Sequence, residues 1–207
     1  MRIGRGVAAV AALSALLASA GCGDAVLKGR GSSYLIVTSI SGASGAEEGK
    51  FFSELDSDVL TLVKKEVDGQ TVYMPTVFQD PGQVSLRIAM KDPTGVGPSD
   101  TNVITIDRYR VEYVRSDGRN TQGVDVPYAF DGAATGTIGS QSSTVGFVLV
   151  RAQAKLEAPL MAMRGSGGAV MISTIAKVTF YGRDQAGSEV SVSANISVNF
   201  ADWGDPD

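Results

Sequence analysis

The 207-residue sequence contains no histidine and only one cysteine, Cys22. Without histidine, the chain cannot form a Ser-His-Asp or Cys-His catalytic set, a histidine metal site or a histidine general base. One cysteine excludes an internal disulfide framework and a zinc site built from several cysteines. The sequence also lacks a basic stretch that could follow a phosphate backbone, so it predicts no nucleic-acid partner.

The N-terminal stretch has the features of an export signal. Arg2 and Arg5 are followed by residues 7–20, which are uncharged and mostly Ala, Leu and Val. A stretch of about 14 residues suits the apolar region of a signal peptide, whereas a membrane-spanning helix needs roughly 20. Removal of residues 1–21 would take both arginines away and leave 16 basic against 22 acidic residues, a net charge of −6.

Ser19-Ala20-Gly21-Cys22 resembles the bacterial lipobox, in which small residues precede a cysteine that is lipidated and becomes the mature N-terminus. The position three before the cysteine is usually Leu, and here it is Ser19. Ala18-Ser19-Ala20 also fits the A-x-A rule of ordinary signal peptidase, which would release a protein that begins at Gly21. The lone cysteine favours the lipoprotein, because lipidation would use an otherwise unpaired and reactive thiol.

The lipobox resemblance implies a signal peptide at residues 1–21 and a lipid anchor at Cys22 in a bacterial membrane. Acyl chains contribute about 0.8 kcal/mol per buried CH₂, so more than one chain gives stable attachment. Residues 22–33 form the predicted tether, because those after the cysteine are mostly small and polar. Gly23 stands where inner-membrane lipoproteins of enterobacteria carry Asp, which favours the outer membrane.

Beyond the tether, the composition indicates an all-β protein. From Cys22 onward the chain has 22 Val but only 9 Leu, and β-branched residues pack well on pleated sheets and lose rotamer freedom in helices. Apolar and polar residues alternate in segments that turn residues separate. We predict strands near residues 34–40, 59–64, 72–78, 84–90, 109–113, 134–138, 146–156, 170–182 and 190–200. Residues 41–58 are predicted as a loop with a helical turn at Phe51–Leu55.

The last two predicted strands form a hairpin. Their even-numbered residues are mostly apolar and their odd-numbered residues mostly polar. Pairing in which residue numbers add to 370, with Phe180 opposite Val190, places the apolar residues on one face. In the strand 146–156, the same alternation predicts that even-numbered residues share one face and that Lys155 lies on the other.

Eight or nine such strands predict two antiparallel sheets packed face to face, with an eight-stranded closed barrel as the alternative. Asp184-Gln185-Ala186-Gly187-Ser188 resembles the Asp-x-Ala-Gly-Asn turn before the final strand of bacterial immunoglobulin-like domains, with Ser188 in place of Asn. The resemblance implies an Ig-like β-sandwich. We assign this domain to residues 34–203 and a C-terminal tail to residues 204–207.

No motif in the chain predicts catalysis. Gly165-Ser166-Gly167-Gly168 lacks the lysine and the helix of a phosphate-binding loop. Acidic pairs such as Glu47 and Glu48 lie in predicted loops, and nothing sets them across a cleft as a glycosidase would need. The sequence therefore predicts a protein that is not an enzyme and holds no cofactor, with a carboxylate-dependent hydrolase as the weaker hypothesis.

The long loop Arg115–Phe130 carries the candidate binding residues. Tyr128 and Phe130 either form a stacking platform for a sugar or peptide or turn inward and close one end of the sandwich, as aromatic side chains more often do. The same loop holds three oxygen donors that could bind a structural calcium, Asp117, Asn120 and Asp125.

These features predict a non-enzymatic, lipid-anchored envelope protein whose sandwich serves in interaction or assembly with a protein partner. The alternative is a glycan- or peptide-binding module that acts through the Arg115–Phe130 loop.

The anchor prediction can be tested by the substitution Cys22→Ser. We expect the variant to leave the membrane fraction for the soluble fraction, because it cannot carry a thioether-linked lipid. Cell fractionation with immunoblotting measures this, and the unaltered chain is the control. A variant that stays with the membrane as the unaltered chain does would show that Cys22 is not the anchor.

Overall fold

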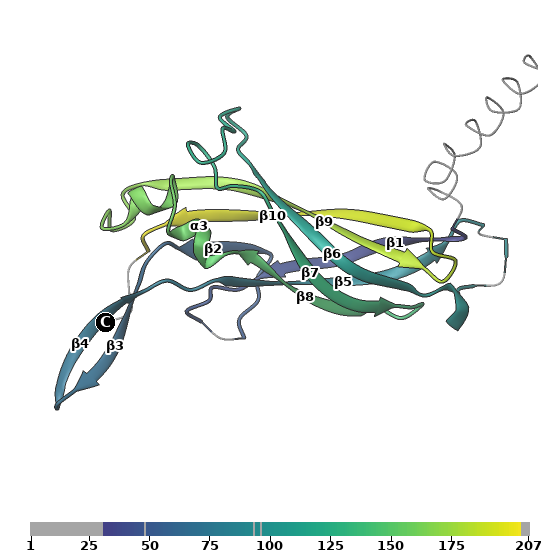
Figure 1. The fold of residues 1–207 in the computed structure, drawn as a ribbon, viewed down its shortest axis with the longest axis horizontal. Coiled ribbons are helices and arrows are strands. Elements are labelled where there is room, and N and C mark those ends of the chain that lie inside the picture. The colour runs from purple at the N-terminus through teal and green to yellow at the C-terminus, as the bar shows by residue number, and fades with distance from the viewer. Residues whose placement is uncertain (1–30, 48, 93, 96, 204–207) are drawn as a thin grey trace, which may run out of the picture.

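A computed structural model describes residues 31–47, 49–92, 94–95 and 97–203. Strands make up most of these residues, and short helical turns connect some of them (Figure 1). The strands are β1 (Ser33–Gly42), β2 (Glu54–Asp58), β3 (Thr61–Val67), β4 (Gln70–Thr76), β5 (Asp80–Met90), β6 (Ile104–Val114), β7 (Phe130–Ile138), β8 (Ser143–Val150), β9 (Met171–Asp184) and β10 (Glu189–Ala201). The helical turns are η1 (Asp100–Asn102), α3 (Ala152–Lys155) and η2 (Leu160–Met163).

Two sheets pack face to face and form a sandwich, as the sequence predicted. One sheet has the strand order β1-β5-β8, and the other has the order β2-β10-β9-β6-β7. Strands β5 and β8 take the places of strands B and E of immunoglobulin domains, and β6, β9 and β10 take those of C, F and G. Among the described strands, β2 and β10 form the one parallel pair. Strands β3 and β4 form a separate two-stranded sheet.

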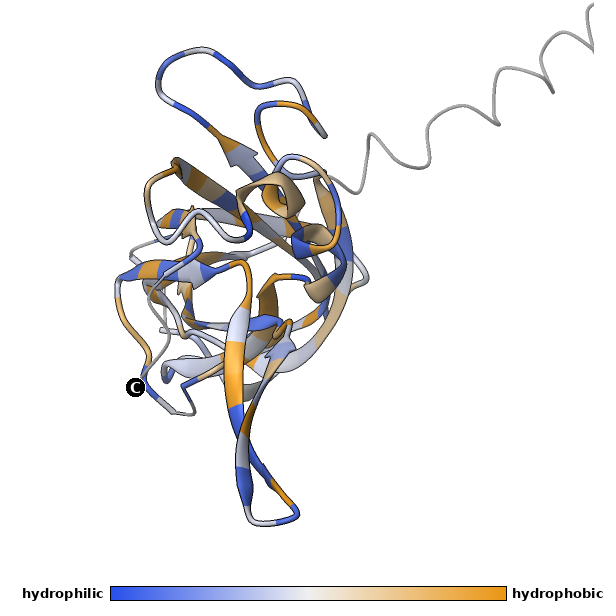
Figure 2. Cartoon of the chain, turned by 90° about the vertical axis from the view of Figure 1, so that its left-hand side faces the viewer, coloured by the Kyte–Doolittle hydropathy of each residue, from blue (hydrophilic) through white to orange (hydrophobic). Residues whose placement is uncertain are grey.

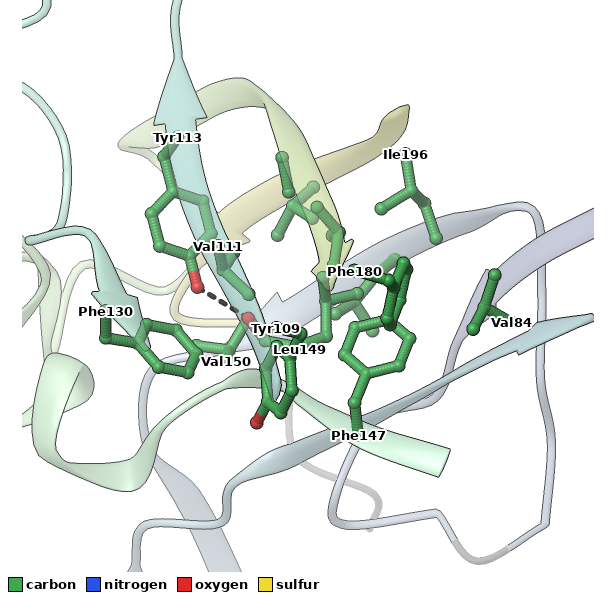
Figure 3. Packing of buried hydrophobic residues seen from close by; sticks show 14 of the residues in the cluster. Val84, Tyr109, Val111, Tyr113, Phe130, Phe147, Leu149, Val150, Phe180 and Ile196 are labelled. Atoms are coloured by element: carbon green, nitrogen blue, oxygen red, sulfur yellow. Dashed lines mark hydrogen bonds between the residues drawn. The ribbon is translucent and has the colours of Figure 1, made fainter. Parts of the chain in front are cut away.

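The core lies between the two sheets and is rich in aromatic rings. The rings of Tyr109 and Phe147 lie edge to face with centroids 5.4 Å apart, and those of Phe147 and Phe180 are 5.2 Å apart. Tyr113 Oη donates a hydrogen bond to the carbonyl oxygen of Leu149 at 2.7 Å (Figure 3). Burial raises the pKa of Tyr113, so its hydroxyl stays a neutral donor that connects β6 with β8 across the core.

The predicted hairpin of β9 and β10 is present, but its predicted register is wrong by two residues. Residue numbers of paired positions add to 372, so Phe180 lies opposite Val192. The carboxylate of Asp184 accepts hydrogen bonds from the backbone N–H groups of Ala186 and Ser188, and the turn is centred on Ala186, one residue later than predicted. A shift of two residues keeps the parity, and so Phe180 is buried as predicted.

The predicted strand 146–156 is wrong in its length and in its buried face. Strand β8 ends at Val150, and it buries Phe147 and Leu149 while Gly146 is exposed. Apolar residues occur at both odd and even positions of this strand, so alternation could not show which face is buried. After Val150 the chain turns through α3, which leaves Leu156 exposed and buries Lys155.

The predicted loop 41–58 with its helical turn is also partly wrong. Residues 54–58 form β2, an edge strand that pairs with the last five residues of β10. Leu55 is buried there because it faces the core, and the strand is too short for its alternation to stand out in the sequence. The strands predicted near residues 34–40, 59–64, 72–78 and 134–138 are all present, as β1, β3, β4 and β7.

The register of β9 and β10 can be tested with a disulfide in a Cys22→Ser chain. We expect Thr179→Cys with Ser193→Cys to oxidise readily, because these residues lie directly opposite each other, where Cα atoms are about 4.5–5.5 Å apart and fit a disulfide. Lys177→Cys with Ser193→Cys is the control, since the register adding to 370 would pair them instead. Thiol counting after mild oxidation shows which pair forms a disulfide. Preferential oxidation of the control pair would refute the register in which Thr179 lies opposite Ser193.

Candidate functional site

The two ends of the sandwich carry different features. Strand β1 begins at the end on the right of Figure 1. The β3–β4 hairpin, the loop after β6 and the segment with α3 lie toward the opposite end. A chain that enters at Ser33 therefore presents these three segments far from its point of entry.

The β3–β4 arm, residues 61–76, stands clear of the sandwich (Figures 1 and 2). Its strands pair from Thr61 opposite Thr76 to Val67 opposite Gln70. The turn consists of Asp68 and Gly69, both with positive φ (52° and 77°), which is the Asp-Gly hairpin turn that matches strand twist. The arm is thus a regular hairpin without a third strand among the described residues.

Apolar side chains on the arm are exposed to solvent. In the sandwich, alternation buries such residues, but here six of them are 37–47% exposed. By register, one face of the arm carries the cross-strand pair Val63 and Met74, with Val72 and Val67 beside it. Leu62 and Tyr73 lie on the other face. Such a concentration of exposed apolar residues is typical of a contact surface.

A buried polar cluster holds the base of the arm. Asp80 starts β5 just after the arm returns, and its side chain is 0% exposed. Its carboxylate accepts hydrogen bonds from Ser57 Oγ at 2.6 Å and from the backbone N–H of Gly45 at 2.9 Å. Lys155 Nζ, 1% exposed, lies 2.9 Å from both carboxylate oxygens. The cluster joins β2, the loop after β1, β5 and α3.

The last residue of β2, three positions before the arm, makes a second set of contacts. Asp58 Oδ2 accepts a hydrogen bond from Thr61 Oγ1 at 2.6 Å, and Asp58 Oδ1 accepts one from the backbone N–H of Trp203 at 3.1 Å. Thr61 is the one buried residue of β3. Thr61 is therefore fixed to the sandwich, and the residues of β3 that follow it are exposed to solvent.

The predicted aromatic platform is divided between the core and the surface. Phe130 is buried, with its ring edge to face against Tyr109 at 6.2 Å and the Arg151 guanidinium 4.4 Å from its centroid. Tyr128 is 49% exposed and packs on Gly123, where any side chain would collide with its ring. The inward orientation that the sequence favoured is correct for Phe130 and wrong for Tyr128, so the two rings form no shared platform.

The three predicted calcium donors hold local hydrogen bonds in the loop. Asp117 accepts bonds from both Arg115 and Arg119, and the Arg115 bond above all keeps the pKa of Asp117 well below its usual range. Asn120 Oδ1 accepts the N–H of Arg115, and Asp125 accepts that of Thr121. Within the described part of the chain, no three His, Cys, Asp or Glu residues cluster as metal ligands.

A hollow of about 380 Å³ lies on the outer face of the larger sheet. A bulge in β6 turns both Asp107 and Arg108 outward, and the Arg108 guanidinium stacks 3.9 Å from the centroid of the Tyr181 ring. Arg183 lies 3.5 Å from Glu189 at the same hollow. Its cations and carboxylates balance one another, so the hollow is a neutral polar surface, and no motif in the sequence predicted it.

The predicted lipidation site, Cys22, lies outside the described residues. Among the helices that the structure describes, none is long and apolar enough to cross a membrane. Comparisons of the chain with protein-family models, with curated proteins and with solved structures found no match.

The separate positions of the two aromatics can be tested by stability measurements. We expect Phe130→Ala to lower the free energy of unfolding by about 3–5 kcal/mol, because it removes a buried ring. Tyr128→Ala should change it by only about 0.5 kcal/mol, as at other exposed positions. Denaturant unfolding of both variants measures this. Equal losses would place Tyr128 in the core and remove the exposed aromatic on which ligand binding through this loop depends.

Proposed function

We propose that this chain is a non-enzymatic, lipid-anchored protein of the bacterial envelope whose Ig-like sandwich presents the β3–β4 arm to a protein partner. The arm is the observation that carries the proposal. A two-stranded hairpin is marginally stable in water on its own, and this one exposes six apolar side chains. A protein surface that covers the arm would bury those side chains and supply the packing that the hairpin lacks.

The position of the arm suits an anchored protein. The predicted tether would join the sandwich where β1 begins, and the arm projects from the opposite end (Figure 1). With Cys22 in the membrane, the sandwich would act as a spacer that holds the arm away from the lipid surface. The proposal for the outer membrane rests on Gly23 after the cysteine.

A glycan- or peptide-binding role through the Arg115–Phe130 loop is the second candidate function. One observation favours it, because Tyr128 and Val124 remain 49% and 68% exposed within an otherwise well-bonded loop. A single exposed ring offers less contact area than the six side chains of the arm, so we place this function second.

The proposed role of the arm can be tested by crosslinking in cells. A photoreactive residue in place of Val72, which shares a face with Val63 and Met74, should give a defined protein adduct. The substitutions Val63→Thr with Met74→Thr should abolish it, because these changes keep strand propensity and remove apolar surface. The partner is identified from the adduct by mass spectrometry.

A matched control comes from the outer face of the larger sheet. Val114 and Ile175 are an exposed cross-strand pair, 44% and 46% exposed, and Val114→Thr with Ile175→Thr should leave the adduct unchanged. Thermal unfolding should show that both double variants keep the sandwich intact. An adduct that survives the arm variant, or the absence of any adduct in the unaltered arm, would contradict the proposal.

A further inference from the structure

We propose that Lys155 and Asp80 become covalently joined by an amide bond between their side chains. The bond would link α3 to the first residue of β5. It concerns the base of the arm and does not depend on whether the arm binds a partner.

The geometry places the two reacting groups in contact and away from water. Lys155 Nζ is 2.9 Å from Asp80 Oδ1 and 2.9 Å from Oδ2, and the two side chains are 1% and 0% exposed. Among the described residues, Nζ has no other hydrogen-bond acceptor or ion-pair partner. Groups held in contact in this way react as if at very high concentration, because the entropy of bringing them together is already lost on folding.

Two donors hold the carboxylate in place. Ser57 Oγ donates to Oδ2 at 2.6 Å, and the backbone N–H of Gly45 donates to Oδ1 at 2.9 Å. Attack on the carboxyl carbon moves negative charge onto these oxygens, and fixed donors at this distance stabilise such charge. Ser57 and Gly45 are thus positioning groups for the reaction.

The reaction balances without any further reagent. A proton passes from the Lys155 ammonium to the Asp80 carboxylate, which leaves a neutral amine and a carboxylic acid. The amine nitrogen then bonds to Asp80 Cγ, the bond from Cγ to Oδ2 breaks, and that oxygen leaves as water with two of the three ammonium hydrogens. The third hydrogen stays on the amide nitrogen, and nothing is oxidised or reduced.

Burial favours the amide over the ion pair. Two charges held away from water lose their hydration, and their mutual attraction offsets that loss only in part. The amide is uncharged, and the water it releases leaves a site with almost no solvent contact. In bulk water, the hydration of both ions would favour the separated groups instead.

Peptide mapping of the full chain, denatured and digested with trypsin, tests the bond. Trypsin would release Asp80 within residues 66–87, and an acylated Lys155 would resist cleavage and stay within residues 152–164. We expect one linked species whose mass is that of these two peptides less one water. If digestion gives residues 66–87, 152–155 and 156–164 as separate peptides and no linked species, the proposal is wrong.

The matched control is Lys155→Arg, which keeps a cation at the position, cannot form this amide and is still cleaved by trypsin. We expect its digest to contain residues 152–155 and 156–164 separately, with residues 66–87 at their unmodified mass. Because the assay is read on denatured chains, it gives a result even if the variant folds poorly. Any linked species in the variant that contains residues 66–87 would show that another residue forms the bond.

Discussion

The contact between Asp80 and Lys155 determines how the arm is attached to the sandwich. Removal of one member of a buried ion pair leaves a lone charge without solvent, a loss that typically costs about 3–5 kcal/mol. Because the same carboxylate also accepts bonds from Ser57 and Gly45, one side chain aligns the strand that leads into the arm with the strand that leads out. The direction of the arm therefore depends on this buried carboxylate together with the contact between Asp58 and Thr61.

Apolar residues serve two opposite purposes in the sandwich and in the arm. In β9 and β10, alternation buries apolar residues between the sheets, where Phe180 and Phe200 have no exposed surface. In β3 and β4, apolar residues occupy both faces, and Val63 and Met74 lie in solvent because no sheet covers them. The sandwich thus gains its stability from apolar residues, whereas the arm has apolar residues available for contact.

Sequence reasoning predicted the features that depend on local pattern. The two-sheet sandwich and the inner face of β9 and β10 follow from alternation, and the Ig-like form follows from the resemblance of the Asp184 turn to bacterial immunoglobulin-like domains. The register of β9 and β10 could not be predicted in this way, because a shift of two residues leaves the same side chains on the inner face. The hydrogen bonds of the turn decide between the two registers. The inner face of β8 was ambiguous because both parities are apolar. The burial of Lys155 could not be predicted, since its partner lies 75 positions away in the chain.

The arrangement of β1 has a mechanical consequence. Strand β1 runs along the long axis and pairs with β5 over most of its ten residues, and the arm leaves the sandwich at the far end (Figure 1). A pull applied between Ser33 and the arm would act along the strands, in shear. The hydrogen bonds of the β1–β5 ladder would then share the load together instead of breaking one after another, as they do when strands are peeled apart. The sandwich is oriented to resist force between its two ends.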